Sequence, residues 1–322
     1  MSSQNKLSKL VHHLGGRQIL VPLAVLIVVV LATGLFSPNL LQFSALMNFL
    51  TDASPLLILV IGGTFPILLG SIDVSVAGMA SLASVLTVLF YPQFGAWSIL
   101  VVILTGALVG CVQGFIHAWS QTPSLVVTLG TLAIVQGVAM LLTGGTPEAV
   151  PDGDNIIAFI GSTSWGVPNS ALVVLAAVLV LALIMRFTRL GRDVFATGSA
   201  ERAAYMSGVK TLRVRVLAFT ISGACAATAG ILLLSISTFS SPTLAGNFLL
   251  LSILGVLVGG TAASGGVGGL ASGVIGGLMT AWFNIVTVVI GVGAEAQNAV
   301  FGILALVAVG FTTDRSKIGV IK

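Results

Sequence analysis

The residues that could do chemistry in this chain are few. Its 322 residues include 13 lysines and arginines, nine acids, three histidines and two cysteines. Cys111 and Cys225 lie in apolar runs without a Cys-x-x-Cys pair or a nearby histidine, so no metal site is indicated. The sequence also has no His-Glu-x-x-His or Gly-x-Ser-x-Gly motif. Neither catalytic residues nor a metal ion is therefore expected.

Two acids, Asp73 and Glu295, lie in or beside apolar sequence. A charge in a lipid-spanning segment costs roughly 2.5–3.5 kcal/mol on insertion scales, so such a residue faces a cavity or a partner. Asp73 either caps the helix expected from Val74 or bonds another helix, or else it contacts a passing solute. Other polar residues of apolar segments could line a hydrophilic path or bond neighbouring helices: Ser71, Gln113, Thr128, Thr131, Gln136 and Asn284.

The elements that must position these residues follow from composition. The chain is 57% hydrophobic and only 7% charged, whereas soluble proteins carry about 25% charged residues. We therefore expect an all-α, polytopic membrane bundle of about ten helices, within a range of eight to ten. The expected spans are 18–36, 41–62, 66–90, 95–118, 122–143, 168–186, 214–236, 246–263, 268–291 and 296–312.

The cations predict the orientation of these spans. Seven of them lie between residues 186 and 215, and the others lie at 6–17 and 315–322. Cytoplasmic segments collect lysine and arginine, so even numbers of crossings should separate the three groups. The expected organisation is a cytoplasmic segment 1–17, one transmembrane domain 18–312 with a cytoplasmic loop 187–213, and a cytoplasmic tail 313–322. Cations at membrane flanks serve topology, so nucleic-acid binding is not expected.

The cation-rich loop has helix signals of its own. After Gly198, Ser199 can cap a helix, Glu201 suits its first turn and Gly208 supplies a stop. Such a helix of about two turns is too short to be stable alone, so it needs a partner. Ala200, Ala203 and Ala204 would give it a smooth face. The alternative is an ordinary cytoplasmic loop, whose cations reflect only the tendency of cytoplasmic segments to collect lysine and arginine.

Residues 259–277 are rich in glycine but have no following Lys-Ser/Thr that would indicate a nucleotide loop. Glycines at every fourth position would form one helical ridge for close packing. The ridge would consist of Gly265, Gly269, Gly273 and Gly277, and Gly259 and Gly260 are also expected to pack helices.

Four stretches resemble permease subunits of ATP-binding-cassette importers of the ribose and branched-chain-amino-acid type. The loop "TRLGRDVFATGSAERAAYMSGVK" is similar to the segment that docks on the ATPase in that family, with Arg202 and Val209 as departures. Three further stretches are similar to other parts of the family, and the resemblance covers about residues 45–311: "GGTFPILLGSIDVSVAGMASLAS", "TPSLVVTLGTLAIVQGVAMLLTGG" and "GGTAASGG". The residues that it implies for ATPase coupling are Arg192, Ser199, Glu201, Arg202, Ala203, Ala204, Ser207 and Gly208.

The resemblance also implies the partners. These are ATPase subunits that carry ATP and Mg²⁺, an extracytoplasmic solute-binding protein, and a second permease copy or paralogue in the bacterial cytoplasmic membrane. No cofactor is expected on this chain itself. The solute is expected to be small, neutral and hydrophilic, with a monosaccharide first and branched-chain amino acids or nucleosides as alternatives.

One departure weakens the sugar assignment. Sugar-transporting members commonly carry an acid just before the Gly-Gly-Thr, where "NFLLLSILGVLVGGT" has only Asn247 and Ser252 as polar residues before that motif. A secondary transporter coupled to an ion is the other alternative, and it would need ionisable groups such as Asp73 or Glu295 inside the membrane.

Overall fold

A computed structural model describes residues 17–150, 156–293, 296–297, 299–304 and 306. Within them, eight helices are long and apolar enough to cross a membrane. The expectation of an all-α polytopic bundle is therefore confirmed. These helices are α2 (Arg17–Phe36), α3 (Phe43–Leu68), α4 (Val76–Phe94), α5 (Trp97–Ser120), α6 (Ser124–Thr143), α8 (Asn169–Phe187), α11 (Thr211–Ser237) and α13 (Leu270–Val289).

Shorter elements connect the long helices. They are η1 (Pro38–Leu41), β1 (Glu148–Ala149), α7 (Ile156–Gly161), β2 (Thr163–Ser164), β3 (Val167–Pro168), α9 (Arg189–Ser199), α10 (Glu201–Met206), β4 (Phe239–Ser240) and α12 (Phe248–Val258). Strand β1 pairs antiparallel with β4, with Glu148 opposite Ser240, and β2 pairs antiparallel with β3.

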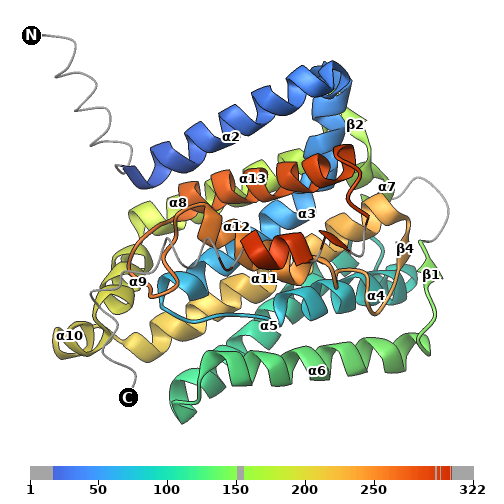
Figure 1. The fold of residues 1–322 in the computed structure, drawn as a ribbon. Helices are drawn as coiled ribbons and strands as arrows, with labels where there is room; N and C mark the ends of the chain where they lie inside the picture. Colours follow the sequence, from blue (N-terminus) through green and yellow to red (C-terminus); the bar gives the residue numbers. More distant parts are fainter. Residues whose placement is uncertain (1–16, 151–155, 294–295, 298, 305, 307–322) are drawn as a thin grey trace, which may run out of the picture.

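The bundle has two distinct ends (Figure 1). Helices α9 and α10 lie together at one, which we call the α10 end, and the β1–β4 pair lies at the other, the strand end. Helix α2 starts at the α10 end, and six long helices lead from it to α9. This even number of crossings agrees with the count expected between the first two cation groups.

Helix α11 lies at the centre and packs against α3, α4 and α5. Its contact with α5 is close because Gly106, Gly110 and Gly114 recur at every fourth position on α5 and face α11. A side chain at Gly110 would overlap the carbonyl oxygen of Phe219 on α11. Small residues let membrane helices approach until their backbones touch, so this ridge holds the core together.

The boundary between α3 and α4 differs from the expected one. Helix α3 runs through Pro66, and the chain is non-helical from 69 to 75, where a helix 66–90 was expected. Neighbouring helices bury Pro66 and stabilise the helix around it. The break comes at Gly70, whose φ of +71° is a conformation that glycine adopts without strain. Asp73 therefore lies in a break between two helices.

The span expected at 246–263 is also different. Helix α12 has 11 residues and so measures about 16.5 Å, too short for a hydrocarbon core of about 30 Å. The non-helical loop 259–269 carries the chain onward to α13. Gly265 and Gly269 lie in this loop with positive φ, so the single helical ridge is wrong. Close packing occurs instead where Gly276 of α13 meets the backbone of Gly255 and Gly259.

Some expectations fall outside the described residues. They concern Glu295, the segment 1–16, most of the last expected span at 296–312, and the tail 313–322.

Candidate functional site

The break between α3 and α4 holds a buried carboxylate. Oδ1 of Asp73 accepts hydrogen bonds from the backbone nitrogen and Oγ of Ser75, at 3.0 and 2.6 Å. Oδ2 accepts from Nε2 of Gln113 on α5 at 3.1 Å and from Oγ of Ser222 on α11 at 2.7 Å. Asp73 therefore links the start of α4 to α5 and α11. These bonds are those expected if Asp73 caps a helix or bonds neighbouring helices.

The structure brings four of the expected path residues together around this break. Ser71, Asp73, Gln113 and Thr128 are all buried, and Oγ1 of Thr128 donates to the backbone oxygen of Ile72 at 3.3 Å. In this conformation they form hydrogen bonds with the chain itself.

The other three expected path residues lie apart from the break. Thr131 donates to Val127 of its own helix, and Gln136 lies against Gly78 of α4. Asn284 lines a separate cavity nearer the strand end.

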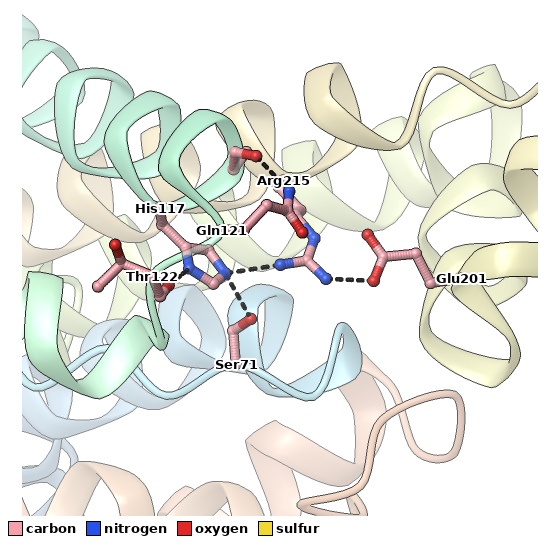
Figure 2. A network of polar contacts seen from close by, with 7 residues as sticks. Ser71, His117, Gln121, Thr122, Glu201 and Arg215 are labelled. Carbon is pink, nitrogen blue, oxygen red and sulfur yellow. Dashed lines mark hydrogen bonds and ion pairs between the residues drawn. The ribbon is translucent and has the colours of Figure 1, made fainter.

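A second polar network begins beside the break and reaches α10 (Figure 2). Nη2 of Arg215 on α11 pairs with Oε2 of Glu201 on α10 at 2.5 Å. Nη1 of the same guanidinium is 2.8 Å from Nε2 of His117 on α5. Nε2 of His117 is also 3.2 Å from Oγ of Ser71. One arginine thus connects α10 to α5, and through the histidine to the α3–α4 break.

The partners of His117 define its hydrogen-bonding state. Its Nδ1 is 2.7 Å from the backbone oxygen of Thr122, and a carbonyl oxygen only accepts, so Nδ1 carries the hydrogen. Because a guanidinium only donates, Nε2 is the acceptor of the bond from Arg215. His117 is therefore held as the neutral Nδ1–H form. The network runs from a carboxylate through a guanidinium and an imidazole to the α5–α6 turn.

The loop 187–213 contains two short helices where one was expected. Oγ1 of Thr188 caps α9 by accepting from the nitrogen of Leu190 at 3.2 Å. The cap residue of α10 is Ala200, without a side-chain bond, so the expected cap at Ser199 is wrong. Glu201 does lie in the first turn of α10, and Gly208 follows the helix with a φ of +86°.

Most residues expected to couple to an ATPase lie on the surface of this end of the bundle. Arg192, Ser199, Glu201, Arg202, Ala203, Ser207 and Gly208 are exposed, whereas Ala204 is buried. The expected alanine face is therefore divided, because Ala204 points inward and Ala203 outward. Tyr205 and Met206 are 66% and 79% exposed, and sequence analysis did not select them.

Helix α9 touches the core through backbone contacts. A side chain at Gly198 would overlap the carbonyl oxygen of Leu68 at the end of α3 and approach the nitrogen of Gly266 in the loop 259–269. The nitrogen of Gly266 donates to that same carbonyl at 2.8 Å. The end of α9 therefore lies against both α3 and the loop that joins α12 to α13.

Sequence analysis missed several residues that the structure places at these sites. His117 lies one helical turn after Gln113, a spacing that puts both on one face of α5. Arg215 was counted only as a cation, although its side chain is 15% exposed. Asp52 was overlooked in an apolar stretch of α3, where an acid is unusual enough to have been a signal.

An all-helical membrane bundle with an exposed pair of short helices fixed to its core has the form of a transporter's membrane-spanning subunit. Residues 45–309 match the family model described as branched-chain amino acid transport system / permease component. The chain belongs to this family of permeases, which are transport components of ATP-binding-cassette importers.

Several curated proteins are similar over most of their length. The probable ABC transporter permease protein YphD of Escherichia coli is 34% identical over 89% of this chain and 87% of its own. The ribose import permease protein RbsC of Bacillus subtilis is 30% identical over 96% of both chains. The autoinducer 2 import system permease protein LsrC of Yersinia pseudotuberculosis is 30% identical over 85% of this chain and 78% of its own. No solved structure matches.

Proposed function

We propose that this chain forms the translocation path of an ATP-driven importer for a neutral monosaccharide. The observation that carries the proposal is the connection from Glu201 through Arg215 to His117, because it ties an exposed helix to the buried core. A partner that moves α10 can therefore act, through this connection, on α5 and on the α3–α4 break.

The partner at the α10 end is an ABC ATPase. The exposed Ala203, Tyr205 and Met206 offer it apolar contact area, and the surrounding cations offer charge complementarity. The sequence has no nucleotide-binding motif of its own, so ATP and Mg²⁺ bind to that separate subunit. Closure of the ATPase moves α9 and α10 and switches the bundle between two discrete arrangements.

The α10 end faces the cytoplasm in this proposal, because seven cations lie between residues 186 and 215. The cations at 6–17 and 315–322 put both chain termini on the same side by the same rule, and a solute-binding protein delivers the solute at the strand end. A second copy of this chain, or a paralogue, completes the path.

The solute class is proposed from the relatives. Two of those described above are named for the import of ribose and of autoinducer 2. The family description names branched-chain amino acids instead, which makes leucine the competing solute to test.

Transport by the whole complex tests this function. The permease, its ATPase and its binding protein would be reconstituted in proteoliposomes, with uptake of D-ribose and L-leucine measured with and without ATP. We expect ATP-dependent ribose uptake that survives collapse of the proton and sodium gradients. Uptake that persists without the ATPase and stops with the gradients would establish an ion-coupled carrier instead.

Labelling of intact cells tests the orientation. A cysteine placed at Ser199 or Ser207, both exposed at the α10 end, should resist an impermeant maleimide until the membrane is opened. Labelling from outside would show that the α10 end faces away from the cytoplasm, and an ATPase could then not bind to α10.

A further inference from the structure

A cavity of about 410 Å³ lies among α3, α12 and α13. This volume is within the range of about 300–1,000 Å³ typical of small-molecule sites. Its walls are apolar except for Asp52 of α3 and Asn284 of α13. Asp52 is nine residues into α3, so it lies about 13.5 Å along the helix from the strand end.

The carboxylate of Asp52 is available to a ligand. Within the described residues no hydrogen bond or ion pair is found for it, and the ion pair found there joins Arg215 to Glu201. It is the only charged side chain among the cavity's described lining residues. Acids in membrane-spanning segments are rare, face the bundle interior or a cavity, and mark solute or ion pathways.

The polar groups of the cavity suit a polyol. An ionised carboxylate accepts through two oxygens and can bind two adjacent hydroxyls, while the asparagine amide both donates and accepts. A free amino acid could pair its ammonium group with Asp52, but its own carboxylate would have no cation among the described lining residues, so it fits less well than a neutral polyol.

Two aromatic rings complete the cavity. Phe49 and Phe248 are in its lining, and such rings can cover the C–H face of a sugar. The ring of Phe49 packs edge-on against Trp282, with centroids 5.0 Å apart. Nε1 of Trp282 is in turn bonded to Oγ1 of Thr33 at 3.3 Å. The aromatic wall is therefore fixed in position before any solute arrives.

The cavity is also connected to the α10 end. Two of its walls, α12 and α13, are joined by the loop 259–269, and Gly266 of that loop lies against Ser199 of α9. A displacement of α9 therefore acts on the connection between the two walls.

We propose that the cavity lined by Asp52 and Asn284 is a contact site for a neutral solute with adjacent hydroxyl groups on its way through the membrane. This inference rests on the proposed function and adds to it the residues that recognise the solute. Asp52 binds a pair of hydroxyls, Asn284 bonds a third polar group, and Phe49 packs on the ring.

The test uses the complete transporter in proteoliposomes, with D-ribose and 2-deoxy-D-ribose as probes at saturating loaded binding protein. Asp52→Asn should lower ribose uptake per ATP hydrolysed by about tenfold or more, the scale of losing hydrogen bonds to a charged group. Stimulated ATP hydrolysis is measured in the same vesicles, so that the loss of uptake is expressed per ATP hydrolysed. Asn284→Ala should act in the same direction. Asn48→Ala is the matched control, because Asn48 is exposed one turn earlier on α3 and outside the cavity lining.

The deoxy sugar separates recognition from a general loss of function. The wild-type transporter should prefer ribose, and Asp52→Asn should remove most of that preference. If Asp52→Asn and Asn284→Ala both take up ribose as fast as the wild type and still prefer it to the deoxy sugar, this inference is overturned. The proposed function would then still stand. A wild-type complex that imports leucine and not ribose would overturn both.

Discussion

The replacement of Arg215 by methionine is the sharpest test of the connection between α10 and the core. Methionine keeps an unbranched apolar stem in place of the arginine but removes both guanidinium bonds. The bond to His117 is the stronger of the two, because the arginine side chain is 15% exposed and the imidazole is buried. A hydrogen bond to a charged group contributes about 1.5–3 kcal/mol. The pair with Glu201, whose side chain is 43% exposed, should contribute about 0.2–1 kcal/mol.

The unequal contributions predict the outcome of double-mutant cycles. His117→Ala combined with Arg215→Met should show a coupling energy of about 1.5–3 kcal/mol, and Glu201→Gln combined with Arg215→Met at most about 1 kcal/mol. Unfolding of the purified permease in graded denaturing micelles gives these values. Stimulation of ATP hydrolysis by loaded binding protein, measured on the whole complex, gives the functional effect.

We expect Arg215→Met to insert normally. Its stimulated ATP hydrolysis should be about tenfold lower, because the lost bond to His117 is at least as large as the ~1.4 kcal/mol that changes an equilibrium tenfold. Arg215→Lys should recover part of it, since a lysine keeps the charge but carries all its N–H donors on one nitrogen, whereas the guanidinium reaches His117 and Glu201 with two. Unchanged stimulation in Arg215→Met, together with a negligible coupling energy to His117, would refute the connection as the route of coupling.

Three further substitutions test the packing beneath the site. Gly110→Ala should lower the unfolding free energy by about 1–3 kcal/mol, because the added carbon overlaps the carbonyl of Phe219; Gly130→Ala, which meets nothing within 4 Å, is the control in the same thermal assay. Asp73→Asn should cost about 1–3 kcal/mol, since the new amide faces hydroxyl or amide donors, and an unchanged melting temperature would contradict the inter-helix role. Gly198→Ala should reduce ATP-driven uptake by displacing α9 from Leu68, as uptake assays with Ala200→Gly as control would show.

The sequence determined the class of the protein through its composition. A chain with 7% charged residues must surround itself with lipid, and lipid allows helices because they satisfy their own backbone bonds. The grouping of cations likewise required an even number of crossings before α9, and the apolar runs gave that number as six. These properties depend on neighbours along the chain, which is why periodicity and residue counts are enough to find them.

Close packing was only partly visible in the sequence. The glycines at 265 and 269 have the same four-residue spacing as those at 106, 110 and 114, yet the first two lie in a loop and the others on the α5–α11 contact. Spacing indicates a ridge only if a helix forms there. Whether it does depends on the backbone contacts that α9 and α3 make with the loop.

The missing acid before the Gly-Gly-Thr shows what tertiary structure alone decided. That segment forms α12, whose Phe248 and Leu251 line the cavity, and a carboxylate reaches the same cavity from Asp52 of α3. Almost 200 residues separate Leu251 from Asp52, so no local pattern could pair them. The same holds for Arg215 and His117, which the packing of α5 on α11 brings within 2.8 Å. Residue types set which contacts are chemically possible, and only the folded chain selects the partners that meet.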